Sequence, residues 1–172
     1  MQQPRKANHG IVPPLINENC DTLILGSMLS PKSVEAQFYY AHPQNRFWQV
    51  MSNIFDSRQA ITTAERSELA LSHGIALWDV IESCDIIGAS DSTIKNVVYN
   101  DIDGLLQRFT RIKTIYTTGG AAYKHLQRYN RKVNNPIISD TVPLPSTSPL
   151  NCKFKLSELI AAYSVIAANR TN

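Results

Sequence analysis

Two polar residues of this sequence, Asn45 and Asp79, occupy positions from which they could act on a substrate. Asn45 ends the run His42-Pro43-Gln44-Asn45, which follows shortly after Tyr39 and Tyr40. A side-chain amide can hold a water through its oxygen and a substrate group through its nitrogen. The same pattern also fits an amide at a helix start without catalytic duty, beside tyrosines that pack in the core. The residues alone leave both interpretations open.

Asp79 comes directly after the apolar run of residues 75–78. An acid at the end of a buried strand is often functional, because burying a carboxylate is costly unless something is paired with it. A loop amide could be that partner, so a structural role is the alternative.

Two other segments could hold phosphate groups. Gly119 and Gly120 would expose backbone amides at a helix N-terminus, or they could serve only to make the turn. Ser146, Thr147 and Ser148 lie in a proline-stiffened run and could donate hydrogen bonds to phosphates. A rigid loop with a helix cap is the other interpretation of that run.

The motifs of several common enzyme classes are missing from the sequence. Gly26 and Ser27 follow a predicted strand, but GxGxxG spacing and a P-loop lysine are missing. There is no GxSxG or HExxH motif, and the four histidines and three cysteines lack metal-ligand spacing. We therefore expect no metal and no cofactor, and the odd number of cysteines suggests free, packed thiols.

The net charge of +3 is distributed unevenly along the chain. Residues 65–103 hold eight of the 14 acids, whereas residues 104–139 hold none. A basic segment is what a protein facing phosphate could present, and a solvated helix face would look the same. The basic residues of this segment are Arg108, Arg111, Lys113, Lys124, Arg128, Arg131 and Lys132.

The hydropathy of the chain indicates a soluble protein. No apolar stretch approaches the ~20 residues that are needed to span a bilayer. The basic start of the sequence has no apolar run behind it, unlike a secretory signal. We expect a cytoplasmic protein that does not bind membranes.

Apolar strands alternate with amphipathic helices, which predicts an α/β fold with a parallel sheet covered on both faces. We expect one domain over residues 1–172, with residues 1–12 as a loose arm and residues 84–100 as a long polar loop. The predicted strands are 21–26, 75–81, 112–117 and a last strand that 136–139 and 141–144 supply together. The predicted helices are 43–55, 62–69, 101–109, 121–129 and a C-terminal helix that includes 156–163.

Ligands of such folds bind beyond the carboxyl ends of the strands. The active site should therefore be assembled from the segments that follow those ends. These segments are 27–33, 78–84, 117–122 and 143–151.

Taken together, these segments resemble one known family. LILGSMLSPKSVEAQFYYAHPQNRFWQVM (residues 23–51) resembles the first motif of the uracil-DNA glycosylase superfamily, and its HPxNRFW portion is similar to mismatch-specific uracil and thymine glycosylases. ALWDVIESC, GASDSTIKN and the late LPSTSPLN resemble the hypoxanthine (deoxyinosine) branch in particular. The resemblance extends from about residue 10 to residue 168.

The resemblance implies a three-layer α/β/α sandwich with a short, mainly parallel central sheet, working as a monomer. It implies a hydrolase of base-excision repair that binds DNA containing deaminated bases. Such an enzyme extrudes the damaged nucleotide and hydrolyses its N-glycosidic bond, leaving an abasic site. A uracil- or mismatch-directed glycosylase of the same fold, or a lesion-binding module without catalysis, are the alternatives.

The resemblance also suggests roles for individual residues. Asn45 and Asp79 would be catalytic. Asn45 would position the attacking water or the sugar, and Asp79, if ionised, would accept the N1–H that hypoxanthine has and adenine lacks. Tyr40 would stack on the flipped base. The base site would consist of Ser27, Met28, Tyr40, His42 and Asp79, and the DNA-binding residues would be Ser146, Thr147, Ser148, Gly119, Gly120 and Lys124.

Two positions depart from related enzymes. Met28 stands where mismatch-specific relatives carry a water-orienting asparagine. Leu144 stands where uracil-specific relatives carry a histidine that stabilises the uracil oxygen. The loss of both groups argues against efficient uracil excision.

Overall fold

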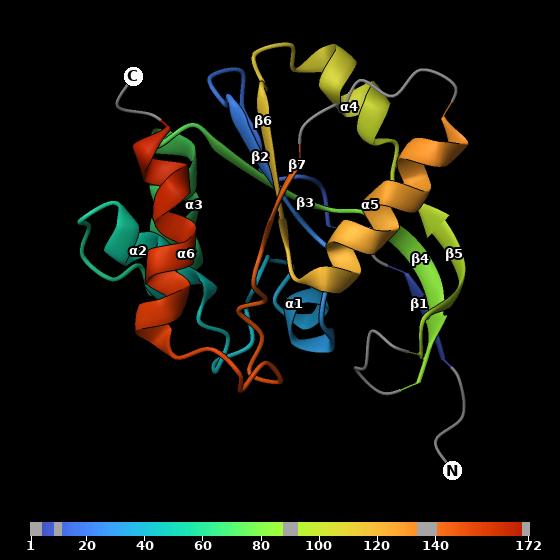
Figure 1. Cartoon of the computed structure of the whole chain (residues 1–172), viewed down its shortest axis with the longest axis horizontal. Helices are drawn as coiled ribbons and strands as arrows, with labels where there is room; N and C mark the ends of the chain where they lie inside the picture. Colours follow the sequence, from blue (N-terminus) through green and yellow to red (C-terminus); the bar gives the residue numbers. More distant parts are fainter. Residues whose placement is uncertain (1–4, 9–11, 88–92, 134–140, 170–172) are drawn as a thin grey trace.

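A computed structural model of the chain describes residues 5–8, 12–87, 93–133 and 141–169 (Figure 1). Within these ranges no helix combines the length and the apolarity that crossing a membrane requires. Cys20 and Cys84 are buried as the sequence predicts, whereas Cys152 is exposed.

The centre of the fold is a four-stranded, all-parallel sheet, as predicted. Its order is β3 (Ile75–Asp79), β2 (Thr22–Gly26), β6 (Thr114–Thr118) and β7 (Thr141–Leu144). Gly26 pairs with Asp79 and Thr118 pairs with Leu144, so the strands end at one common edge. We call this the carboxyl edge of the sheet.

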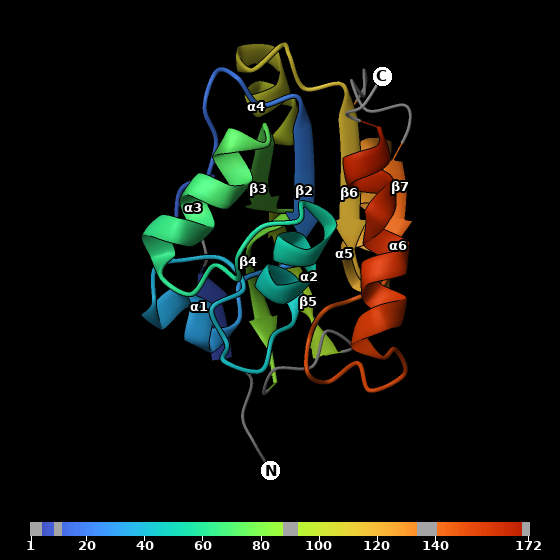
Figure 2. The same cartoon turned by 90° about the vertical axis from the view of Figure 1, so that its left-hand side faces the viewer.

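Helices cover both faces of this sheet and confirm the three-layer α/β/α fold. α2 (Phe47–Ile54), α3 (Thr63–Ser72) and α6 (Leu156–Ala168) share one apolar core with Ile24, Leu77 and Tyr116, and Figure 2 looks onto this layer. α4 (Ile102–Arg108) and α5 (Gly120–Lys132) share the second core with Leu23 and Leu25. Neighbouring residues of β2 thus point into different cores, as they must in a pleated strand.

A second, antiparallel sheet corrects two predictions. β4 (Ile81–Ile86) lies between β1 (Arg5–Asn8) and β5 (Lys95–Tyr99). Residues 5–8 therefore pair with β4 instead of belonging to a loose arm. Most of the predicted polar loop 84–100 is strand, apart from residues 88–92, which lie outside the described residues.

Several helix boundaries also differ from the predictions. Thr62 and Glu65 form the expected capping box at the start of α3. α2 begins at Phe47 and not at Pro43, because residues 42–45 form a turn of their own. A short helix that the sequence did not suggest, α1 (Pro31–Glu35), follows β2 with Ser30 as its N-cap. Residues 136–139, predicted as strand, lie outside the described residues.

The strand order locates the place where a ligand is expected. The chain leaves β2 toward the layer of α2 and α3, whereas it leaves β6 into α5 on the opposite face. Two neighbouring parallel strands whose connections diverge in this way form the binding crevice of open α/β sheets. Here that point is the carboxyl edge between Gly26 of β2 and Thr118 of β6.

Candidate active site

The carboxyl edge of the sheet collects residues from all four predicted segments. Ser27 and Met28 follow β2, Asp79 ends β3, Gly119 follows β6, and Ser146 lies two residues beyond the end of β7. This edge is at the lower ends of β6 and β7 in Figure 1. The pattern-based expectation that one site is assembled from these segments agrees with this arrangement.

The Asp79 carboxylate lies against the end of β2. Asp79 is only 5% exposed, and Asn100 Nδ2 donates to its backbone carbonyl at 2.8 Å. A Cβ atom added to Gly26 would overlap the Asp79 carboxylate and would lie 3.4 Å from the Tyr40 hydroxyl. Gly26 therefore leaves the space in which the carboxylate sits, and the carboxylate lies close to Tyr40.

Tyr40 is held in one orientation by its ring and by its hydroxyl. The ring stacks on Phe47 with centroids 3.8 Å apart and planes 13° apart, and the hydroxyl is hydrogen-bonded to Thr118 Oγ1 at 3.1 Å. Its φ of +53° is unfavourable for a tyrosine, so the surrounding contacts must hold the backbone in place. Burial, followed by the negative charge of Asp79, raises the pKa of the Tyr40 hydroxyl far above its ordinary value, which keeps it protonated.

Hydrogen bonds also fix the turn that carries Tyr40. Trp48 Nε1 donates to the Tyr39 carbonyl at 2.9 Å, and the Tyr39 hydroxyl donates to the Pro13 carbonyl at 2.9 Å. The backbone amide of Ala41 donates to Ser33 Oγ at 3.1 Å. Tyr39 is thus a structural residue of the core, and Tyr40 alone of the pair reaches the carboxyl edge.

Asn45 lies in the turn before α2 and not in the first turn of that helix. Its Oδ1 accepts hydrogen bonds from the Phe47 backbone amide and from Thr147 Oγ1, both at 2.9 Å. Its own backbone amide donates to the His42 carbonyl at 2.8 Å. His42 Nδ1 accepts from the Gln44 amide at 3.1 Å, so the neutral ring carries its proton on Nε2.

Arg46 joins this turn to the loop after β7. Its guanidinium donates to the carbonyls of Asn151 at 2.8 Å and Ser148 at 3.3 Å, and also to that of Phe154. Its backbone amide donates to the Thr147 carbonyl at 3.1 Å. Sequence reasoning missed this residue, although an arginine directly before the apolar Phe47 and Trp48 was a usable signal; the structure shows it half-buried.

In the loop after β7, two of the predicted DNA-binding residues are partly exposed and a third is buried. Ser146 and Ser148 are half-buried, whereas Thr147 is 1% exposed and directs its hydroxyl to Asn45. Thr147 is therefore placed to support Asn45 and is too buried to meet a phosphate. Leu150 is 73% exposed near the tip of the same loop.

Gly119 and Gly120 lie at the start of α5, next to this loop. Gly119 has φ of +88°, and a Cβ there would come within 3.1 Å of Ser146 Cβ, so the two segments approach closely. Its amide donates to the Leu144 carbonyl at 2.8 Å, whereas Gly120 faces open space. Lys124 is exposed one turn further along α5.

The predicted basic segment is divided between two ends of the molecule. Lys124 lies in the part of α5 that starts at the carboxyl edge. Arg111 and Lys113 precede β6 and Arg108 ends α4, so these residues lie at the opposite edge of the sheet. Only part of the segment can face a ligand bound at the carboxyl edge.

Comparison with known proteins shows which family this chain belongs to. The model of the uracil DNA glycosylase superfamily matches residues 13–164. The chain belongs to that superfamily. A hypoxanthine DNA glycosylase of Methanosarcina acetivorans is 32% identical over 148 residues, which make up 83% of this chain and 87% of the relative. One of Methanosarcina barkeri is 33% identical over 108 residues, 62% of this chain and 68% of the relative.

A solved structure of the superfamily has the same fold. The solution NMR structure of a candidate uracil DNA glycosylase from Methanosarcina acetivorans superimposes with a TM-score of 0.73 at 28% identity. The superposition covers 90% of this chain and 96% of that protein. The likeness therefore extends over most of both chains.

Met28 and Leu144, the two positions expected to depart from related enzymes, both pack in apolar surroundings. Met28 Sδ accepts a hydrogen bond from the Cys84 thiol at 3.5 Å and packs against the small apolar cluster of Ile81 and Ile86. Leu144 is 6% exposed and belongs to the core under α2 and α6. Neither residue offers a polar group to a substrate.

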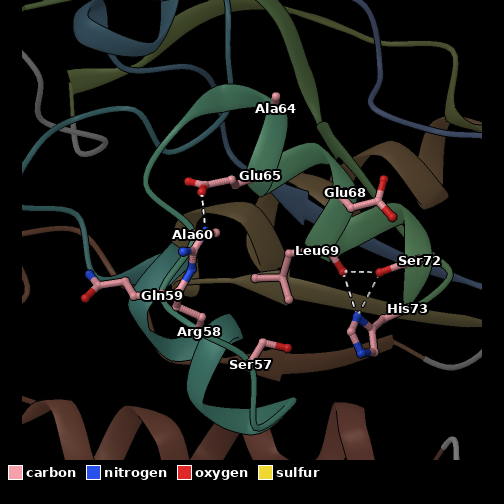
Figure 3. A pocket seen from close by; sticks show the side chains of 10 residues that line it. All are labelled: Ser57, Arg58, Gln59, Ala60, Ala64, Glu65, Glu68, Leu69, Ser72 and His73. Carbon is pink, nitrogen blue, oxygen red and sulfur yellow. Dashed lines mark hydrogen bonds and ion pairs between the residues drawn. The ribbon is translucent and has the colours of Figure 1, made fainter.

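The described residues also form a hollow of about 520 Å³ away from this superfamily site (Figure 3). It lies between the segment after α2 and the outer side of α3, and His73 closes one end by stacking on Phe55. None of the predicted site residues lines it. Among the described residues, those of the hollow included, no three His, Cys, Asp or Glu side chains are grouped so that they could hold a metal ion.

Proposed function

We propose that this chain is a hypoxanthine DNA glycosylase that removes deaminated adenine from DNA. The observation that carries the proposal is the buried Asp79 carboxylate beside Tyr40, at the edge where this fold binds ligands. The relatives named hypoxanthine DNA glycosylases support the same substrate. The reaction adds water to C1′ of the deoxyribose and breaks the C1′–N9 bond, which leaves an abasic site and free hypoxanthine.

Asp79 and Tyr40 would recognise the flipped base. Hypoxanthine carries a proton on N1, which an ionised Asp79 accepts, whereas adenine presents a bare acceptor that the carboxylate repels. One face of Tyr40 is covered by Phe47, so a base would stack on its other face. Guanine also has an N1–H, and the space around its extra amino group must exclude it.

Ser27, Met28 and His42 would complete the base site. The backbone carbonyl of Ser27 accepts from the Ile81 amide at 3.0 Å, which fixes the segment just after β2. Met28 would add an apolar wall backed by Cys84. His42 would offer its Nε2–H as a donor to the base or the sugar.

Asn45 would supply the catalytic hydrogen bond. Glycosidic cleavage passes through a state in which positive charge grows on the sugar and negative charge on the departing base. A fixed hydrogen-bond donor aimed at the departing base stabilises that charge without having to reorganise during the reaction. The Asn45 amide is held in this way by Phe47 and Thr147.

The loops of the carboxyl edge would hold the DNA backbone. Ser146, Ser148 and the amide of Gly120 can donate to phosphates, and Lys124 adds a positive charge. Leu150 would enter the gap that the flipped nucleotide leaves, because it is the large apolar side chain exposed on this loop. The protein would act as a cytoplasmic monomer on DNA that contains deaminated bases.

Strand cleavage of a duplex with a single inosine tests the proposal, with alkali revealing the abasic site. Wild type should cleave at the inosine, and Asn45→Ala should abolish or nearly abolish cleavage. Gln44→Ala is the matched control, because Gln44 is exposed and contributes only its backbone amide to the turn. Retained duplex binding without any cleavage by wild type would instead identify a lesion-binding module.

A further inference from the structure

We infer that Thr147 is a positioning residue for catalysis, which locks the Asn45 amide so that only its Nδ2 hydrogens face the substrate. The inference rests on the proposed function. It assigns a task to a residue of the loop after β7, whereas Asn45 lies in the turn before α2. The two residues are 102 positions apart in the chain, and their side chains meet at 2.9 Å.

The orientation of the Asn45 amide follows from its two partners. A backbone N–H can only donate, so the atom that faces the Phe47 amide at 2.9 Å must be Oδ1. The Thr147 hydroxyl donates to the same oxygen. An amide oxygen has two lone pairs, and here both are used.

The position of Thr147 is itself fixed. Its side chain is 1% exposed, so water does not compete for its hydroxyl. Its carbonyl accepts from the Arg46 amide at 3.1 Å, and the Arg46 guanidinium binds three further carbonyls of the same loop. The loop can therefore hold the hydroxyl at a constant distance from Asn45.

This geometry determines what Asn45 can contribute. With Oδ1 occupied, the amide cannot accept a hydrogen bond from the attacking water, and it acts by donating through Nδ2. No acceptor among the described residues is bonded to Nδ2, which leaves it available to the substrate. Without the hydroxyl of Thr147 the amide would be held by one bond and could rotate.

Single-turnover excision of inosine with enzyme in excess tests the inference. Thr147→Val replaces the hydroxyl with a methyl group of similar size, and we expect a rate about 10- to 100-fold lower, the usual effect of a misplaced catalytic group. Thr147→Ser keeps the hydroxyl and should restore most of the rate. In an Asn45→Ala background, Thr147→Val should cause no further loss, because residues that act as a unit are not additive.

Thr141→Val is the matched control, because the buried hydroxyl of Thr141 has no partner among the described residues and Thr141 begins β7, at the edge of the sheet opposite the site. It should excise at the wild-type rate. A wild-type rate for Thr147→Val, or failure of Thr147→Ser to recover, would overturn the inference. A further loss caused by Thr147→Val in the Asn45→Ala background would do the same, since Thr147 would then act on something other than Asn45.

A measurement without substrate separates this inference from the proposed function. The Nδ2 resonances of Asn45 in an amide NMR spectrum should report a rigid side chain in wild type and a mobile one in Thr147→Val. Rigid resonances in both proteins would contradict the positioning role. A wild type that fails to excise inosine would contradict the proposed function, whatever the resonances show.

Discussion

At the scale of single residues, the site requires the glycine at position 26 as well as the polar side chains around it. Gly26 has an ordinary backbone conformation, so conformational freedom does not explain its presence. The reason is spatial, because the Asp79 carboxylate occupies the position that a Cβ would need. The sequence shows a strand ending in glycine, but it cannot show that a carboxylate from the neighbouring strand fills the space.

Gly26→Ala should therefore reduce activity more than stability. The added methyl group displaces a flexible carboxylate and not a backbone atom, so the fold can adjust. We expect inosine excision to fall about 10- to 100-fold through misplacement of Asp79. Excision rates and thermal unfolding, measured on the same preparation, check this. Loss of the folded state together with activity would show that Gly26 serves packing instead.

Asp79→Asn should weaken the preference for inosine. The neutral amide keeps the shape but replaces a charged acceptor, and a hydrogen bond to a charged group contributes about 1.5–3 kcal/mol. The rate on inosine should fall roughly 10- to 150-fold, while the rate on a matched adenine duplex should not fall. An unchanged rate on inosine would mean that Asp79 does not read N1.

At the scale of elements, the central sheet could be predicted and the second sheet could not. The strands of the parallel sheet are continuous apolar runs, which is typical of strands covered on both faces. β5 is mostly exposed, its Asn96 has φ of +50°, and its pairing with β4 shifts register, so no clean alternation marks it. α1 has only five residues, too few to show a helical period.

The candidate site, too, could be predicted from the sequence only in part. The turn at residues 42–45 and the loop after β7 could each be predicted as candidates from their residue types. The hydrogen bonds by which Arg46 and Thr147 join the two segments could not be predicted. Hydrogen bonds between residues about 100 positions apart leave no local pattern in the sequence. Sequence reasoning therefore placed Thr147 on a phosphate, whereas its side chain lies inside.

The junction between these two loops should be important for stability. Arg46→Met keeps the aliphatic stem but removes the hydrogen bonds to three carbonyls, and we expect the free energy of unfolding to fall by roughly 2–4 kcal/mol. Arg58→Met is the comparison, because Arg58 is 87% exposed in its ion pair with Glu65 and should matter little. Urea unfolding of both variants measures the difference, and equal effects would contradict the account.

The contact between α5 and β5 should make stability depend on pH. Burial, followed by the charge of Arg128, lowers the pKa of His125, which also contacts the Tyr99 hydroxyl at 3.3 Å. The unfolded chain therefore takes up a proton more readily than the folded chain, and stability should fall as the pH drops below the ordinary value of 6.5. Thermal unfolding at pH 7.5 and 5.5 should show a smaller difference in His125→Gln than in wild type. An unchanged difference would rule out His125 as the cause.

At the scale of the whole molecule, DNA should bind across the carboxyl edge, and the opposite edge should be free. Lys124 and Lys113 are both exposed and belong to the same basic segment, but they lie toward opposite edges of the sheet. Lys124→Gln should reduce the slope of log affinity against log salt concentration by about 1, as expected for one lost phosphate contact. Lys113→Gln should leave the slope unchanged. Equal effects of the two variants would indicate that DNA does not bind mainly at the carboxyl edge.

The central claim, that this member of the superfamily excises hypoxanthine, is tested most directly by wild-type excision rates on three duplexes that differ only in one base. We predict rapid release from inosine, much slower release from uracil because Leu144 offers no polar group, and no release from adenine. Uracil released as fast as inosine or faster would contradict the account, because the enzyme would then not be directed at hypoxanthine. Release of adenine would contradict it as well, because the Asp79 carboxylate would then not read N1 of the purine.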